Sequence, residues 1–175
     1  MPSDTFINLK LEKKRKITAA LLTEFSENSL ANSQVARIVS GAEISRGAFY
    51  KYFADLQDSY HYCLGLVLQE VHAGMGEKFE RLRSVDDYFR FVKNFINSSE
   101  DNQYFSFIKW HFTENEAIVG EINNFPAKAN LISSSVLKWG ATILCHETIR
   151  QYLLEPHLKD QLLNYLRISL KKIEG

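Results

Sequence analysis

The chain has 175 residues, which is enough to bury a hydrophobic core, and its 45% hydrophobic and 24% charged residues are ordinary for a folded, water-soluble protein. Three prolines and eight glycines exclude long disordered or repeat segments. The formal net charge is zero, but residues 1–53 carry eight Lys or Arg against five Asp or Glu, so the positive charge is concentrated at the N-terminal end.

Neither an export signal nor a membrane helix is predicted. Residues 1–16 lack the continuous apolar run of a signal peptide, and no apolar run approaches the ~18 residues of a membrane helix. Cys63 and Cys145 form no CxxC motif, which is typical of a reducing compartment and of small core residues. We therefore expect a cytoplasmic protein without a membrane partner.

Apolar residues recur at helical spacing along almost the whole chain, without the sustained alternation of strands joined by hairpin turns. The sequence therefore predicts an all-α protein. A first helix is expected over about residues 12–26, where Ile17, Leu21 and Phe25 form an apolar stripe behind a basic run at residues 13–16.

Two short helices are predicted next. Ser33 is the expected N-cap of the first, which has Ile38 on its inward side, and Gly41 marks the break that follows it. Ser45 is the expected N-cap of the second, over about residues 46–53.

Longer helices follow. An amphipathic stretch over about residues 56–82 is expected to link two domains, and Ser84 with Asp87 has the spacing of a capping box that begins another helix. Further helices are predicted over residues 102–113, over residues 128–154 after the break at Phe125-Pro126, and from Pro156 to about residue 173.

Residues 35–53, VARIVSGAEISRGAFYKYF, together with the helix before them resemble the DNA-binding domain of the TetR family of transcriptional regulators. The family pattern places apolar and aromatic residues in the first helix and ends the third helix with Tyr-x-Tyr-Phe. The matching positions, without a gap over about 37 residues, are Ile17, Ala20 or Leu21, Phe25, Ser33, Ile38, Ala42, Ile44, Ser45, Gly47, Phe49, Tyr50, Tyr52 and Phe53.

The resemblance implies a helix-turn-helix DNA-binding domain over residues 1–55 and a helical regulatory and dimerisation domain over residues 56–175. Arg46, at the start of the recognition helix, can pair with a guanine or with a phosphate. The basic run can reach the DNA backbone or simply be solvated. We expect the residues that bind double-stranded DNA to be Lys14, Ser33, Gln34, Ser45, Arg46, Gly47, Ala48, Tyr50 and Lys51.

Three positions depart from the family pattern. Glu43 replaces the glycine that is usual in the turn before the recognition helix, Ser29 replaces a loop glycine, and Leu56 replaces a lysine. Because a side chain disfavours positive φ, we expect the turn to use another geometry, relieved by Gly41. Glu43 adds negative charge and Leu56 removes a phosphate contact, so weaker non-specific affinity is expected.

The resemblance also implies a repressor that binds a palindromic operator as a homodimer and is released by a small-molecule effector. The last two helices would form the dimer surface, with Gly140 allowing close helix approach. The apolar residues expected to face inward there, together with the leucines of the last helix, are Val136, Leu137, Ile143 and Leu144.

An effector site is expected in an aromatic-rich segment, because nine of the 22 aromatic residues lie within residues 88–112. An aromatic stripe at helical spacing is more typical of plain core, so both readings stay open. No cofactor is expected. The ligand-binding candidates are Phe91, Phe95, Phe107, Trp110 and His111.

No nucleophile, acid–base pair or metal motif has informative spacing, so the sequence does not indicate an enzyme. Two alternatives stay open. One is a metal or thiol sensor that uses Cys63, Cys145 and His146. The other is a helical interaction protein that keeps the fold but has lost operator binding, which Glu43, Leu56 and the neutral net charge favour.

Overall fold

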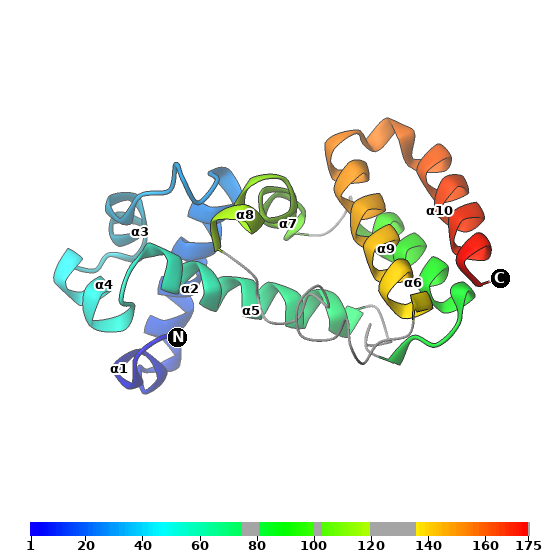
Figure 1. Ribbon diagram of the computed structural model, residues 1–175. Coiled ribbons are helices and arrows are strands. Elements are labelled where there is room, and N and C mark those ends of the chain that lie inside the picture. Colours follow the sequence, from blue (N-terminus) through cyan, green and yellow to red (C-terminus); the bar gives the residue numbers. More distant parts are fainter. Residues whose placement is uncertain (75–80, 100–102, 120–135, 175) are drawn as a thin grey trace. The chain divides into compact units, whose positions relative to one another are not determined.

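The computed structural model describes residues 1–74, 81–99, 103–119 and 136–174, and all regular secondary structure in these ranges is helical (Figure 1). The all-α prediction is therefore confirmed. The chain forms two compact units, of which the first comprises Met1–Glu70 with Ser106–Gly120 and the second Val71–Phe105 with Glu121–Gly175. The first unit thus extends beyond residue 55, since later helices pack on the N-terminal ones.

Five helices begin in the first unit, and the last of them, α5, continues past Glu70 into the second. They are α1 (Asp4–Ile7), α2 (Leu11–Glu27), α3 (Val35–Ala42), α4 (Arg46–Tyr52) and α5 (Leu56–Gly74). The first predicted helix corresponds to α2, in which Ile17, Leu21 and Phe25 are buried as expected. Of the helix predicted over residues 56–82, the structure describes α5 over Leu56–Gly74, and Leu82 at the predicted end is not helical.

Aromatic rings fill the centre of the first unit. Phe25 and Phe107 both lie against Tyr60, with ring centroids 5.1 and 5.2 Å from that of Tyr60. A second cluster joins Phe6 to Phe53, at 4.8 Å between ring centroids. Offset and edge-on aromatic pairs of this kind add to the hydrophobic stabilisation of buried area.

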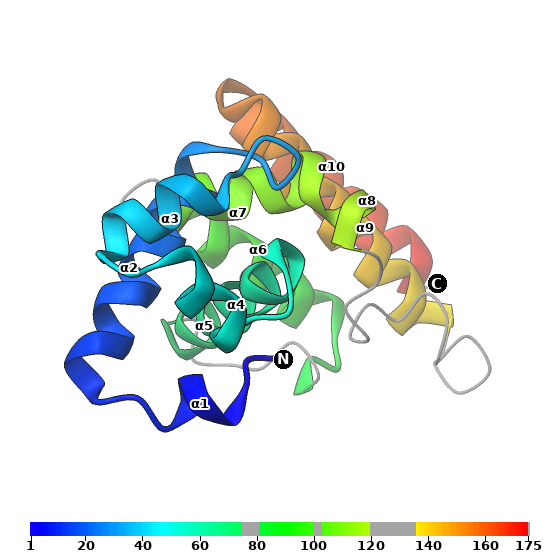
Figure 2. The ribbon, with the colours of Figure 1, turned by 90° about the vertical axis from the view of Figure 1, so that its left-hand side faces the viewer.

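A continuous helical segment, α7 (Phe105–Trp110), η2 (His111–Asn115) and α8 (Glu116–Val119), completes the first unit. The middle part, η2, is a π-helical turn, a rare conformation that interrupts α-helices and frequently occurs at functional sites. Figure 2 shows α7 and α8 beside the loop that joins α2 to α3. The helix predicted over residues 102–113 therefore begins later than expected and continues further.

In the second unit, α6 (Val85–Ser99), α9 (Val136–Leu154) and α10 (Lys159–Glu174) pack against one another, with the short η3 (Pro156–Leu158) between the last two (Figure 1). The predicted capping box is confirmed, since the Asp87 N–H donates to Ser84 Oγ at 3.2 Å and the Ser84 N–H to Asp87 Oδ2 at 3.0 Å. The predicted break at Phe125-Pro126 and the start of the next helix at residue 128 lie outside the described residues.

The leucine-rich face of α10 belongs to the core of the second unit, where Leu162, Leu163, Leu166 and Leu170 are buried. No helix in the described part of the chain is both long and apolar enough to cross a membrane.

Candidate nucleic-acid interface

The predicted recognition helix corresponds to α4, which divides its residues between a buried and an exposed side. Ser45 is its N-cap, as predicted, and Ser45 Oγ accepts a hydrogen bond from the Ala48 N–H at 3.1 Å. Phe49 and Tyr52 are buried and fix the helix to its own unit. On α4 and its N-cap, the residues predicted to bind DNA that are exposed are Ser45, Arg46, Gly47, Tyr50 and Lys51, while Ala48 is half-buried; Gln34, at the start of α3, is exposed as well.

Arg46 and Tyr50 form a pair one helical turn apart on the exposed side of α4. The guanidinium donates a hydrogen bond to the Tyr50 hydroxyl at 3.2 Å and lies 5.6 Å from the centroid of its ring. A guanidinium over an aromatic face is attracted by the ring electrons. The pair holds the Arg46 cation at the first turn of α4. A guanidinium has five N–H donors, so those that do not bond Tyr50 are available to a ligand.

Gly47 has no packing role within the described residues. A Cβ built at this position meets no atom within 4 Å. The absence of a side chain therefore leaves the backbone of α4 open on its outer surface, as a close approach by DNA would require.

The start of α3 is capped by Glu24, which the sequence analysis did not identify. Its buried carboxylate accepts hydrogen bonds from the Gln34 N–H at 2.7 Å and from Arg37 Nη2 at 2.6 Å. The hydrogen bonding of Arg37 to the Glu24 carboxylate raises the pKa of Arg37. The prediction that Ser33 caps α3 is wrong, because Gln34 is the N-cap residue and buried Ser33 instead donates to the Ser29 carbonyl at 2.9 Å.

Glu43 occupies the turn between α3 and α4 in the left-handed conformation, with φ 51° and ψ 46°. The expectation that this turn would avoid positive φ is therefore wrong. The Glu43 carboxylate lies 2.6 Å from Lys16 Nζ on α2, and this ion pair lowers the pKa of Glu43. Gly41 serves a different purpose, because a Cβ there would lie 3.4 Å from the Cβ of Ala20 where α2 and α3 pack.

The N-terminal helix α1 contacts the end of α4. The Ser3 N–H donates to the Tyr52 carbonyl at 2.9 Å, and Ser3 Oγ donates to the Lys51 carbonyl at 2.7 Å. Phe6 is fully buried beside Phe53 and Tyr62. These bonds satisfy carbonyls that a helix leaves unpaired at its C-terminus.

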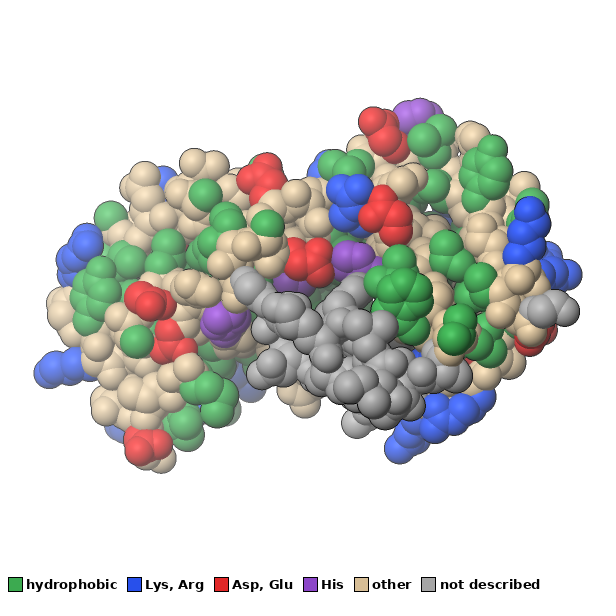
Figure 3. All heavy atoms as spheres, viewed as in Figure 1, with side chains coloured by type: hydrophobic (Ala, Val, Ile, Leu, Met, Phe, Trp, Pro, Cys, Tyr) green, Lys and Arg blue, Asp and Glu red, His purple; other side chains and the backbone are tan. Residues whose placement is uncertain are grey.

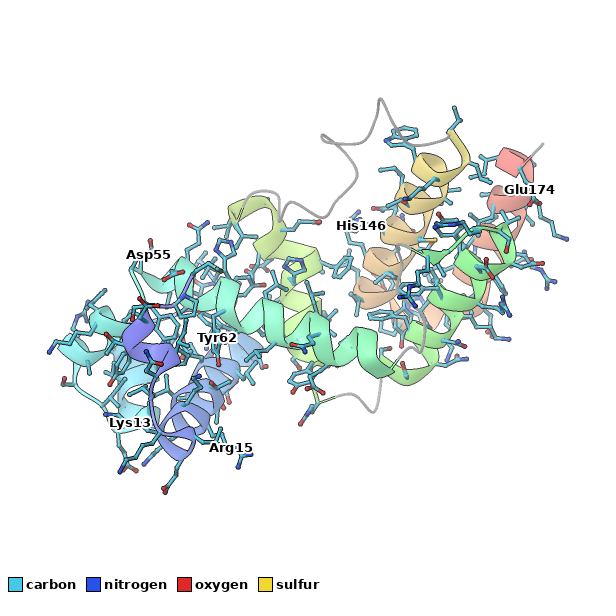
Figure 4. The ribbon with its side chains drawn as sticks, turned by 90° about the horizontal axis from the view of Figure 1, so that it is seen from below. Lys13, Arg15, Asp55, Tyr62, His146 and Glu174 are labelled. Carbon is cyan, nitrogen blue, oxygen red and sulfur yellow. The ribbon has the colours of Figure 1, made fainter. Side chains whose placement is uncertain are left out.

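Lysines of the basic run have partners within the first unit. Lys14 Nζ donates to the Ile7 carbonyl at 2.8 Å and lies 5.7 Å from the centroid of the Phe6 ring. Lys13 lies 5.9 Å from the ring centroid of Tyr52. In Figure 4, Lys13 and Arg15 are labelled on α2, and Asp55 and Tyr62 at the start and along the first part of α5.

The segment around η2 ties the loop between α2 and α3 to the rest of the unit. Asn115 Oδ1 accepts the Leu30 N–H at 2.8 Å, and Trp110 Nε1 donates to the Ser26 carbonyl at 3.1 Å. These partners lie more than eighty residues apart in sequence, so no local pattern could have indicated them.

The predicted effector-binding residues are divided between the two units. Phe107 is fully buried and stacked on Tyr60, and His111 Nδ1 lies 3.1 Å from the Tyr60 hydroxyl. Both belong to the first unit, as does Trp110, whereas Phe95 is buried and Phe91 half-buried on α6 in the second. Burial raises the pKa of the Tyr60 hydroxyl above its ordinary range.

The two cysteines are buried, and burial raises the pKa of both thiols, that of Cys145 to about 12. Such thiols are protonated and unreactive at neutral pH. Within the described ranges, no three His, Cys, Asp or Glu side chains are grouped as metal ligands would be.

Part of the predicted dimer surface is exposed on the second unit, with Val136 at 82% and Ile143 at 37% exposure. Figure 3 shows hydrophobic side chains at the surface over α9 and α10. The leucines of α10 do not join them, because they pack within the protomer. Gly140 also acts within the protomer, since a Cβ there would lie 3.3 Å from Ile173 Cδ1 on α10.

No protein-family model and no curated protein sequence matches the chain. Among solved structures, a TetR family transcriptional regulator from Chloroflexus aurantiacus J-10-fl is similar with a TM-score of 0.52 and 21% identity, over 99% of this chain and 97% of that one. At this identity the similarity is one of fold, and the chain accordingly has the all-helical fold of that TetR family regulator.

Proposed function

We propose that the chain is a TetR-like transcriptional regulator that binds double-stranded DNA through α3 and α4. The observation that carries this proposal is the exposed side of α4, where Arg46, Tyr50 and Lys51 project from a helix anchored by buried Phe49 and Tyr52. A short helix so anchored, with cationic and hydroxyl groups outward, suits a recognition helix that lies in the major groove. The fold likeness supports the same proposal.

DNA binding is tested with a fluorescent duplex that carries the sequence flanking the chain's own gene, titrated at two salt concentrations. We expect affinity to fall with salt, and Lys51→Ala to weaken binding and reduce the slope of log affinity against log salt by about 1. Lys171→Ala is the matched control, because it removes an exposed lysine from α10 in the other unit. The proposal would be refuted if the wild type failed to bind the duplex at both salt concentrations and if alanine at Tyr50 and Lys51 left that result unchanged.

That failure would instead support the second candidate, a helical interaction protein. The Glu43 carboxylate beside α4 favours this candidate, as does half-buried Leu56, which supplies no charge where the family pattern has a lysine.

We further propose that the regulator acts as a homodimer, because a palindromic operator presents successive major grooves ~34–36 Å apart to two recognition helices. The exposed apolar side chains of α9 and α10 support this proposal, since apolar side chains at a surface are typical of protein–protein interfaces. Sedimentation at micromolar concentration is expected to give twice the chain mass, and Ile143→Asp to give the monomer. A monomeric wild type would contradict the two-site model. The exposed apolar residues of α9 and α10 include Val136, Trp139, Ile143, Tyr165 and Ile168.

Repression relieved by a small-molecule effector completes the proposal. Phe91 and Phe95 on α6 and the Phe107, Trp110 and His111 group are its candidate contacts, in separate units. Native mass spectrometry of the purified protein tests for a retained ligand, and a retained ligand that weakens DNA binding when added back is the expected result. A ligand with no effect on affinity would refute its role as effector.

A further inference from the structure

We propose that Glu43 weakens DNA binding by forming an ion pair with Lys16, which contacts a DNA phosphate when the ion pair is broken. This inference rests on the proposed DNA binding, because it concerns the charge that surrounds α3 and α4. The Glu43–Lys16 ion pair would then regulate DNA binding, and Lys16 is the residue that its loss would release.

The backbone at Glu43 is unusual. Among the described residues, Glu43 is the single non-glycine residue with a positive φ. A left-handed conformation crowds a side chain and is relaxed for glycine. Glu43 therefore carries its side chain in a backbone conformation that favours glycine.

The carboxylate pairs with Lys16 across the surface of the first unit. The two charged groups lie 2.6 Å apart, and both side chains are accessible to solvent, at 45% for Lys16 and 76% for Glu43. The pair joins the exposed side of α2 to the turn that leads directly into Ser45 and α4. A ligand that covers the exposed side of α4 therefore approaches both charges.

The ion pair weakens DNA binding through both of its residues. A lysine whose charge is neutralised by a neighbouring carboxylate releases fewer counterions when it meets a phosphate. The carboxylate also repels phosphates, and an exposed ion pair exchanges readily because it is weak in water. Removing the Glu43 charge should therefore remove a repulsion and release Lys16 to bind the backbone.

Four variants separate these effects: Glu43→Gln, Glu43→Gly, Lys16→Ala and the double variant Lys16→Ala/Glu43→Gln. The probe is a fluorescein-labelled duplex of mixed sequence, titrated between about 50 and 200 mM salt. We expect Glu43→Gln to bind about 3- to 10-fold more tightly at the lower salt and with a salt slope steeper by about 1. In the Lys16→Ala background the gain should be at least about 3-fold smaller, with an unchanged slope.

Glu43→Gly controls for backbone strain, and a fifth variant, Glu114→Gln, controls for net charge. Glu43→Gly should match Glu43→Gln in affinity and raise the Tm by about 2–4 °C, because glycine relieves the left-handed turn. Glu114→Gln removes the same charge from the exposed Glu114 side chain of η2 and should leave affinity unchanged.

An equal gain in both Lys16 backgrounds would overturn the release of Lys16, and a gain confined to Glu43→Gly would assign the effect to the backbone. If Glu43→Gln binds like the wild type while Lys51→Ala binds less tightly, this inference fails alone. If the wild type and Lys51→Ala bind equally and without salt dependence, the proposed function fails and this inference fails with it.

Discussion

Replacing Glu24 by alanine is expected to destabilise the first unit more than any surface substitution there. The carboxylate is 4% exposed and accepts hydrogen bonds from the Gln34 N–H and the Arg37 guanidinium. Loss of an N-terminal cap costs about 1 kcal/mol, and loss of hydrogen bonds to a buried charged group about 1.5–3 kcal/mol. Arg37 is 43% exposed and can turn to water, so the cost should stay below that of stranding a buried charge.

The expected loss is therefore about 3 kcal/mol for Glu24→Ala, which corresponds to about 6–12 °C in Tm for a chain of this size. The chain contains two tryptophans, one in each unit, so the substitution is made in a Trp139→Phe background. Fluorescence of Trp110, which is hydrogen-bonded to the Ser26 carbonyl, then reports on the first unit alone during urea unfolding.

Glu27→Ala is the matched control, because Glu27 is an exposed acid at the end of the same helix. Arg37→Ala and the double variant complete a cycle, in which the double variant should lose less stability than the sum of the single losses. A loss below about 0.5 kcal/mol for Glu24→Ala, or strict additivity with Arg37→Ala, would refute the capping role that we assign to Glu24.

Other expected outcomes test separate parts of the structure. Phe6→Ala should lower stability by about 3–5 kcal/mol, measured by the same urea unfolding, because it empties a fully buried ring site; a loss under 1 kcal/mol would contradict the packing of α1. Cys63 and Cys145 should resist a thiol reagent at pH 8 until urea unfolds the chain, since burial raises the pKa of both thiols; rapid native labelling would favour the thiol-sensor alternative. Hydrogen bonds from Ser84, Arg83 and Arg90 lower the pKa of Asp87 from its ordinary 3.8, so its contribution to stability is present above pH 3.8 and lost as pH falls through the depressed value. The stability gap between wild type and Asp87→Asn should accordingly shrink on acidification below about pH 4, and a gap independent of pH would contradict the capping box.

Elements set by nearby residues were predicted closely. The apolar stripe of α2, the Ser45 cap of α4 and the Ser84–Asp87 capping box each depend on contacts within one or two helical turns, and local spacing encodes such contacts. The end predicted for α5 at residue 82 was placed too late, because amphipathic spacing reaches Leu82 in the sequence while Leu82 is not helical.

The cap of α3 could not be predicted from local spacing. Ser33 has the side chain that is typical of an N-cap, but the acceptor used is Glu24, ten residues before Gln34. Similarly, Asn115 meets Leu30 only because the two segments pack together. Glu43 was misjudged for another reason: the cost of positive φ is modest, and an ion pair with Lys16 accompanies it.

The placement of α4 depends on segments outside the motif that identifies it. A helix of seven residues is too short to be stable in isolation, so its position must be imposed by its neighbours. Ser3 binds its final carbonyls, while the Glu43–Lys16 pair holds the turn before it to α2. Because the Ser3 bonds reach the end of α4 from outside the motif, a substitution at Ser3 can change how the recognition surface is presented without altering any residue that we expect to touch DNA.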